Sequence, residues 1–131
     1  AEMVMAVDMK GNVFAVTPKG EELWTRKNAF GESARVIARP VLLPTGEVLI
    51  VSGNGDMKIF DAEGKISYER SVGATVHSTP VIAGESIVLA TTGGTELLKA
   101  YTFDLKEAWT FVGTIDAKTE ATIATKAAEG K

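Results

Sequence analysis

The residues of this 131-residue chain that could act in catalysis form no convincing combination of acid, base and metal ligands. His77 is the one histidine, and the chain has no cysteine, which excludes disulfides, thiolate metal sites and cysteine nucleophiles. A single histidine without an obvious acidic partner or second metal ligand is more typical of a structural residue than of a catalytic one. The residues themselves therefore predict no catalytic group, no metal site and no cofactor.

Three basic side chains are candidates for ligand binding. Arg35 and Arg39 alternate with apolar residues, so both side chains are expected on one side of an extended segment. There they could line a channel and attract an anionic ligand. His77 stands in a later segment at the place that Ile37 has in this one, and could border the same channel. Exposure alone, or pairing of an arginine with Glu47, accounts for the pattern equally well.

Acidic and amide side chains occur in glycine-containing stretches that predict turns. These residues are Asp8, Asn12, Asn54 and Asp56. They lack the D-x-[DN]-x-[DN]-G spacing of a calcium loop, so ordinary turn chemistry is favoured. The glycine-rich phosphate loop, the nucleophile elbow of hydrolases and the zinc-protease motif do not occur in the sequence.

Three large aromatic residues, Trp24, Tyr68 and Trp109, end a pattern that occurs three times. Each copy is an alternating apolar run, a short polar turn and a second run, at residues 13–24, 57–68 and 98–109. This pattern predicts β-hairpins. Because the aromatic residue keeps a fixed place, we expect it to pack between adjacent sheets rather than to stack on a ligand.

The turns of the three predicted hairpins differ at one position. Gly20 and Gly64 have the same place in the first two turns, where glycine favours a positive φ. The third turn has Leu105 there, so we expect it to be built differently.

A further strand precedes each hairpin, beginning near Glu2, Gly46 and Glu85. Ahead of the last two lies another apolar segment with a Pro-Val pair, at Pro40 and Pro80, which are 40 residues apart. Because proline lacks a backbone donor, this segment is expected to be an edge strand. The repeat is thus four short strands in about 40 residues, which is typical of a propeller blade, and the chain is predicted to be all-β.

The hairpins resemble the PQQ-like, or quinoprotein-type, β-propeller repeat, in which an aromatic residue and an alanine precede a turn glycine and a tryptophan. The matching residues are Phe14, Ala15, Gly20 and Trp24 in the first copy, Phe60, Gly64 and Tyr68 in the second, and Ala100, Tyr101 and Trp109 in the third. The Ser-Thr-Pro-Val run at 78–81 resembles the start of the family's inner strand. A WD40 repeat fits less well because no Gly-His pair occurs. The resemblance covers nearly the whole chain and implies a fold rather than a function.

We therefore predict one β-propeller domain of three four-stranded antiparallel sheets over residues 1–131. Its parts are blade 1 at about 1–33, blade 2 at about 34–73, blade 3 at about 74–113 and a linker at 114–120. Blade 1 has no inner strand upstream of it in the sequence. The tail 121–131 repeats the inner-strand pattern, with Ala121 in the place of Ala74, and is predicted to supply that strand.

Three blades are too few to close a ring, because propellers have about four to eight. The tail of one chain is therefore expected to complete blade 1 of another, and two chains would form a six-bladed ring by head-to-tail contact. An open arc or fibre is the other product of such contacts. The alternative is that the chain is a fragment of a larger PQQ-like propeller.

Composition restricts the partners of the chain. It is 45% hydrophobic and 24% charged with a net charge of −3, so it offers no basic surface for nucleic acid. No apolar run approaches the ~20 residues of a membrane helix. The favoured function is a non-catalytic scaffold or binding module that uses its loops or central channel for a protein or small ligand.

The family resemblance adds two implications about function. It implies a periplasmic or extracellular setting with an envelope protein as a partner. As the alternative to a scaffold, it implies that the chain belongs to a quinone-dependent dehydrogenase with a calcium-bound cofactor. A designed or reconstructed propeller would also show repeats, although the divergence of the three copies argues against a consensus design.

Overall fold

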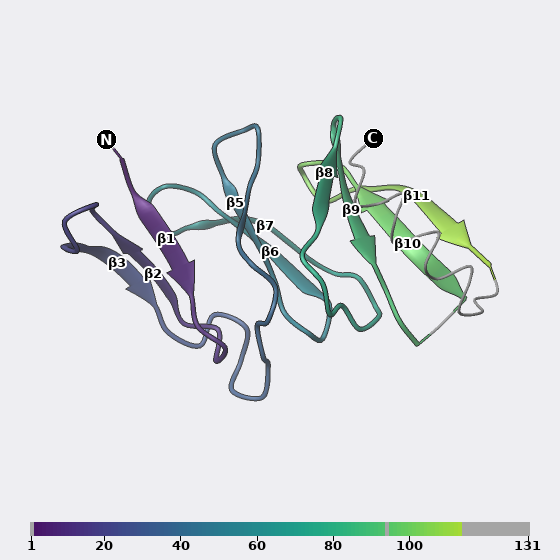
Figure 1. Cartoon of the computed structure of the whole chain (residues 1–131), viewed down its shortest axis with the longest axis horizontal. Coiled ribbons are helices and arrows are strands. Elements are labelled where there is room, and N and C mark those ends of the chain that lie inside the picture. Colours follow the sequence, from purple (N-terminus) through teal and green to yellow (C-terminus); the bar gives the residue numbers. More distant parts are fainter. Residues whose placement is uncertain (1, 94, 114–131) are drawn as a thin grey trace.

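The computed structural model describes residues 2–93 and 95–113, and these residues form eleven β-strands (Figure 1). In chain order the strands are β1 (Val4–Val7), β2 (Val13–Val16), β3 (Glu22–Arg26), β4 (Val41–Leu42), β5 (Val48–Val51), β6 (Asp56–Phe60), β7 (Ile66–Ser71), β8 (Val81–Ala83), β9 (Ser86–Ala90), β10 (Glu96–Tyr101) and β11 (Glu107–Val112). The described residues contain no helix that is long and apolar enough to cross a membrane. The prediction of an all-β chain is confirmed.

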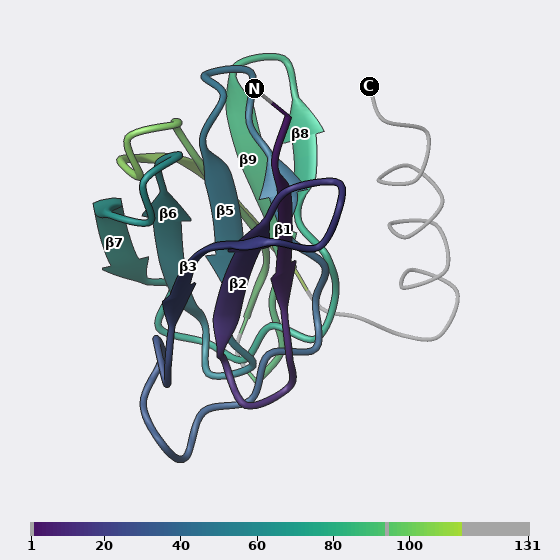
Figure 2. The ribbon, with the colours of Figure 1, turned by 90° about the vertical axis from the view of Figure 1, so that its left-hand side faces the viewer.

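The strands form three antiparallel sheets. Sheet 1 has the order β1-β2-β3, sheet 2 the order β4-β5-β6-β7 and sheet 3 the order β8-β9-β10-β11. Figure 1 shows them side by side in chain order along the long axis, and Figure 2 shows them one behind another with sheet 1 nearest the viewer. The fourth strand predicted for sheet 1, residues 121–131, lies outside the described residues, as does the linker 114–120.

The three predicted hairpins are confirmed as β2–β3, β6–β7 and β10–β11. In each hairpin the large aromatic residue lies opposite the equivalent position of the preceding strand: Ala15 opposite Trp24, Ile59 opposite Tyr68 and Ala100 opposite Trp109. This shared register means that equivalent residues of the three sheets point to equivalent sides.

All three hairpins have the same turn. The N–H of Gly20 donates to the carbonyl of Thr17, and the N–H of Leu105 donates to the carbonyl of Thr102 in the same way. Leu105 has a φ of 61°, close to the 88° of Gly20 and the 80° of Gly64. The prediction of a different third turn is therefore wrong. Leu105 adopts a left-handed conformation that costs about 1–2 kcal/mol, and burial of its side chain offsets this strain.

Two prolines lie where each inner strand begins. Pro40 directly precedes β4 and Pro80 directly precedes β8, and both strands lie at an edge of their sheets, as predicted. The first strand of sheet 1, β1, is also an edge strand among the described residues, whereas β5 and β9 are each flanked on both sides.

Buried side chains form two apolar clusters between the sheets. The cluster between sheets 1 and 2 includes Phe30, Ile50 and Phe60. The larger cluster between sheets 2 and 3 includes Leu49 and Leu89. Because neighbouring residues of a strand point to opposite faces, Leu49 and Ile50 of β5 contribute to different clusters. Sheet 2 is therefore buried on both of its faces.

Candidate functional site

The three candidate binding residues lie in two extended segments, residues 34–40 and 74–80, that lead into β4 and β8. Ala34 and Val36 are 4% and 3% exposed, whereas Arg35, Ile37 and Arg39 are exposed. Alternate residues of the first segment thus point into the molecule and into solvent. Both arginine side chains lie on the solvent side together with Ile37, which is 60% exposed.

The second segment alternates in the same way from Ala74 to His77, and it is joined to the first segment by a hydrogen bond. Val76 is 3% exposed, and His77 is exposed. The backbone N–H of Arg39 donates to Oγ1 of Thr79 at 3.2 Å, which joins the two segments. We use the name entry stripe for four of the exposed side chains of the two segments, namely Arg35, Ile37, Arg39 and His77.

The entry stripe has side chains suited to binding rather than to proton transfer. Glu47, the expected partner of an arginine, accepts a hydrogen bond from Thr45 at 3.2 Å. Ion pairs among the described residues involve Arg70, Lys99 and Lys106. Within residues 2–93 and 95–113, no three His, Cys, Asp or Glu side chains are grouped so that they could hold a metal. Arginine is enriched at protein interfaces, and an exposed apolar side chain beside it adds area that a partner can bury.

The acidic turn residues serve their own turns. Oδ1 of Asp8 accepts hydrogen bonds from the backbone N–H groups of Lys10 and Asn12, and the Asn12 side chain donates to Oδ2 at 2.9 Å. These bonds, that of the Asn12 side chain above all, hold the pKa of Asp8 below its ordinary value. Asn54 and Asp56 lie in a separate turn, where the N–H of Asp56 donates to the hydroxyl of Ser52. The structure thus brings Asp8 and Asn12 together but keeps the other pair apart from them.

The three aromatic residues lie in different surroundings. Trp24 lies between sheets 1 and 2: its Nε1 donates to the carbonyl of Ala62 at 2.8 Å, and its ring stacks on Phe60 with 6.5 Å between centroids. Tyr68 and Trp109 are 44% and 45% exposed.

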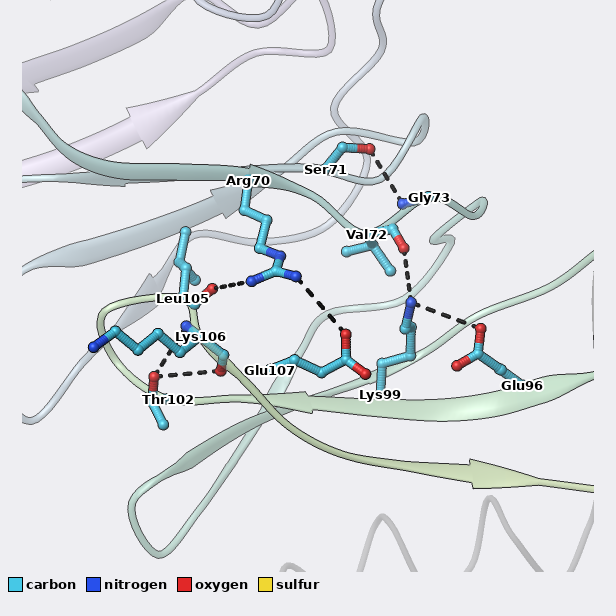
Figure 3. Close-up of polar contacts among 10 residues, drawn as sticks. All are labelled: Arg70, Ser71, Val72, Gly73, Glu96, Lys99, Thr102, Leu105, Lys106 and Glu107. Atoms are coloured by element: carbon cyan, nitrogen blue, oxygen red, sulfur yellow. Dashed lines mark hydrogen bonds and ion pairs between the residues drawn. The ribbon is translucent and has the colours of Figure 1, made fainter.

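Two arginines that the sequence reasoning did not single out join neighbouring sheets. Nε and Nη2 of Arg26 donate to the carbonyls of Gly64 and Glu63, each at 2.9 Å. Nη1 of Arg70 donates to the carbonyl of Leu105 at 3.1 Å, and its Nη2 lies 3.8 Å from Oε2 of Glu107 (Figure 3). Each arginine thus reaches from the last strand of one sheet to the hairpin turn of the next.

Two lysines make the return contact. Nζ of Lys58 donates to the carbonyl of Ala29 at 2.7 Å and lies over the ring of Phe30. Nζ of Lys99 donates to the carbonyl of Val72 at 3.0 Å, as Figure 3 shows. The charged side chains of Arg26, Arg70, Lys58 and Lys99 therefore join neighbouring sheets through hydrogen bonds to backbone carbonyls.

A signal for the two arginines is present in the sequence. Arg26 and Arg70 are 44 residues apart, the same spacing as Gly20 and Gly64. This recurrence marks a repeated role. It does not identify the partners, because the acceptors are backbone carbonyls that every residue possesses.

The chain forms stacked antiparallel sheets, each made of strands that follow one another in the sequence, and the pattern repeats about every 40 residues. This arrangement is that of a β-propeller protein. The sequence matches the PQQ-like family described as "Outer membrane protein assembly factor BamB" over residues 9–131. The chain therefore belongs to this family of PQQ-like propeller proteins, as its resemblance implied.

Solved structures share the fold at low sequence identity. BamB from Moraxella catarrhalis is 14% identical with a TM-score of 0.70, and the match covers 89% of this chain and 34% of that one. The β-propeller domain of Cps50 (Swd1) from Myceliophteria thermophila is 13% identical with a TM-score of 0.62, covering 97% and 40%. A protein of unknown function from Bacteroides caccae is 11% identical with a TM-score of 0.58, covering 86% and 42%. The chain thus spans less than half the length of each, and a comparison with curated proteins gives no match.

Proposed function

We propose that the chain is a non-catalytic propeller scaffold that binds a protein through the entry stripe. The observation that carries this proposal is the 60% exposure of Ile37 between two exposed arginines. An exposed apolar side chain flanked by guanidinium groups offers both apolar area and hydrogen-bond donors to a protein surface. Arg26, Lys58, Arg70 and Lys99 support a scaffold role, because their side chains donate to backbone carbonyls of a neighbouring sheet and so join the sheets.

We infer the class of partner from the family. Its description names an outer membrane protein assembly factor, which supports a polypeptide of the outer membrane as partner and a periplasmic setting for the chain. A small anionic ligand that binds Arg35, Arg39 and His77 in a channel is the other kind of partner that the entry stripe allows.

A binding titration tests the role of the entry stripe. The probe is a fluorescently labelled outer-membrane β-barrel polypeptide diluted out of urea, and its anisotropy is followed as the 131-residue chain is added. Ile37→Glu should weaken binding about tenfold or more, because it places a charge in the apolar part of the contact. Ile66→Glu is the matched control, since Ile66 is 40% exposed on the distant strand β7. Equal weakening by both variants, or no binding by the unaltered chain, would contradict the proposal.

We also propose how the scaffold is completed. Taking 1–33, 34–73 and 74–113 as its blades, two copies join head to tail into six blades, and the tail 121–131 of each adds a strand beside β1 of the other. The edge position of β1 supports this arrangement, because β5 and β9 in the other sheets are flanked by an inner strand. Mass in solution, with and without 121–131, tests it. A particle mass of 13.9 kDa for the unaltered protein in solution would exclude the ring. A filament would show that the contacts form without closing.

A further inference from the structure

A cavity of about 470 Å³ lies between sheets 1 and 2, where the end of β3 meets the hairpin turn between β6 and β7. Its volume is within the range of about 300–1,000 Å³ that small-molecule sites have. Phe60, which is 1% exposed, contributes a buried apolar surface to it, and Lys27, Lys65 and Ile66 contribute exposed side chains. The cavity therefore combines a buried apolar part with an edge that solvent reaches.

The charged residues that line this cavity are all cationic. They are Arg26, Lys27 and Lys65, and among the described residues no aspartate or glutamate lines it. The chain as a whole has a net charge of −3, so this positive charge is gathered locally. An apolar lining with a few cationic groups suits an anion that carries an apolar part.

The guanidinium of Arg26 is held in place and keeps hydrogen-bond donors. Its Nε, Nη1 and Nη2 donate to the carbonyls of Gly64, Thr25 and Glu63. These bonds use three of the five N–H groups of a guanidinium. Within residues 2–93 and 95–113 the other two have no acceptor, and Arg26 has no ion pair. The positive charge of Arg26 is thus positioned by the backbone without being neutralised by a carboxylate.

The contact between sheets 2 and 3 shows which group such an arginine takes as its partner. Arg70 is the counterpart of Arg26, since each lies two residues after the large aromatic residue of its strand. Nη2 of Arg70 lies 3.8 Å from Oε2 of Glu107, as Figure 3 shows. In that contact a carboxylate of the chain itself therefore faces the arginine.

Two differences in the repeat remove this internal partner between sheets 1 and 2. Ile66 has the place of Glu107, because each lies opposite the last residue of the preceding strand. Lys27 directly follows Arg26, whereas the neutral Ser71 directly follows Arg70. The first difference removes a negative charge and the second adds a positive one. The arginine position is thus the same in both contacts, but the carboxylate is missing from the first.

We propose that the cavity between sheets 1 and 2 binds a small organic carboxylate with an apolar body. The carboxylate faces Arg26 and Lys27 as that of Glu107 faces Arg70, and it accepts the remaining guanidinium N–H groups in charge-assisted hydrogen bonds. The apolar body packs against Ile66 and the buried ring of Phe60. This site is separate from the entry stripe and goes beyond the proposed function, because its lining belongs to sheets 1 and 2 of one chain.

A titration followed by amide chemical shifts tests the site, with phenylpropionate as the probe. We expect saturable binding with a Kd of about 1 mM or tighter, and shifts concentrated on the end of β3 and the turn between β6 and β7. Phenylpropanamide has the same shape without the charge and should bind about tenfold more weakly or worse. Acetate lacks the apolar body and should also bind more weakly. Absence of phenylpropionate binding, or equal binding of the acid and the amide, would overturn the proposal.

Ile66→Glu is the most direct variant, because it restores the carboxylate that the other contact has. The introduced side chain should face Arg26 and weaken phenylpropionate binding about tenfold or more. Leu42→Glu is the matched control: it makes the same change of charge at a side chain that is 71% exposed on β4, and it should keep the affinity. Equal affinity in the Ile66→Glu and unaltered chains, or equal loss in both variants, would contradict a carboxylate beside Arg26.

Lys27→Ser provides a second variant that leaves the contact between the sheets intact. Lys27 is exposed, and serine is the residue of the second contact at this place, so the variant should melt at the same temperature and bind phenylpropionate several-fold more weakly. Lys10→Ser removes the same charge from an exposed turn outside the cavity and should bind as the unaltered chain does. If Lys27→Ser also binds unchanged, the carboxylate does not lie where we place it.

The two proposed binding sites can fail separately. The Ile66→Glu chain should lose phenylpropionate and keep the β-barrel polypeptide, whereas the Ile37→Glu chain should lose the polypeptide and keep phenylpropionate. Loss of both ligands in the Ile66→Glu chain would overturn the assignment of the cavity to a small molecule, because the polypeptide would then bind there. Phenylpropionate binding without any polypeptide binding supports the cavity and contradicts the entry stripe alone.

Discussion

Leu105 shows how one residue can satisfy a turn that its type disfavours. Its φ of 61° lies in the left-handed region, and its side chain is 3% exposed between sheets 2 and 3. A Cβ in that region costs about 1–2 kcal/mol, while a buried leucine side chain contributes about 1.5–3 kcal/mol. The turn is retained because the two terms nearly cancel.

Substitution of Leu105 should therefore reverse the usual order of alanine and glycine. Leu105→Ala loses the buried side chain and keeps the strain, at a cost of about 2–5 kcal/mol. Leu105→Gly loses the side chain but relieves the strain, and should be about 1 kcal/mol more stable than the alanine variant. Urea unfolding of both variants measures the difference.

Leu89 provides the control for this comparison. It is 1% exposed in the middle of β9, where glycine should be less stable than alanine by about 0.5–1 kcal/mol. The same order at Leu105 and Leu89 would show that the left-handed turn is not a source of strain.

The carboxylate of Asp61 couples a turn to pH. Its Oδ1 accepts hydrogen bonds from the N–H groups of Lys65 and Glu63, each at 2.9 Å, and the Lys65 bond is the main cause of a pKa below 3.8. Because the pKa is lowered in the folded state, the stabilisation is present well above the ordinary pKa of 3.8 and is lost as the pH falls through the lowered pKa. Asp61→Asn should therefore lose less stability than the unaltered chain on acidification.

Thermal unfolding between about pH 5 and pH 2 provides the measurement for Asp61. Glu63→Gln removes a carboxylate from the same turn and should keep the acid dependence of the unaltered chain. An Asp61→Asn chain whose melting temperature falls as steeply as that of the unaltered chain would contradict the role of the turn.

At the scale of elements, the hairpin turns and the last strands of the sheets determine how neighbouring sheets meet. Gly64 is required twice, because its φ of 80° favours glycine and because Trp24 lies against it. Gly64→Ala should cost about 1–2 kcal/mol from strain and about 1–3 kcal/mol more from the clash with Trp24. Gly46→Ala has the strain alone and should cost only about 1–2 kcal/mol. Equal midpoints in urea would show that the Trp24 ring moves aside freely.

The sequence predicts these elements well because their signals are local. Alternation and the turn glycines at 20 and 64 predict the hairpins, and Pro40 and Pro80 predict the edge strands. The prediction for the turn of Leu105 was wrong because the burial that offsets the strain of this residue comes from sheet 2, which is far away in sequence. The contacts of Arg26 escaped detection for a related reason: its acceptors lie 37 and 38 residues away on the backbone.

The candidate site was predicted less completely than the fold. The alternation around Arg35 indicated one shared side, and the structure places Arg35, Ile37 and Arg39 in solvent. Nothing local indicated that Thr79 would bond to the backbone of Arg39 and bring the second segment alongside, because that contact depends on how two sheets stack.

At the scale of the whole molecule, the three sheets of the described residues form a series in which each packs against its neighbours. Stability in such a series is approximately a sum of the stability of each unit and of each contact. Sheet 2 has two contacts, and its strand β5 is buried along most of its length. Within residues 2–93 and 95–113, sheet 1 packs against sheet 2 alone, and β1 alternates between exposed and half-buried residues. The series therefore has a stable centre and a weaker first sheet.

Hydrogen exchange should reveal this gradient. Amides of β5 and β6 should exchange slowest and those of β1 and β2 fastest, because local opening needs less apolar surface exposed in sheet 1. Native-state exchange followed by mass spectrometry measures this order. Protection of β2 as high as that of β5 would show that sheet 1 is as stable as sheet 2.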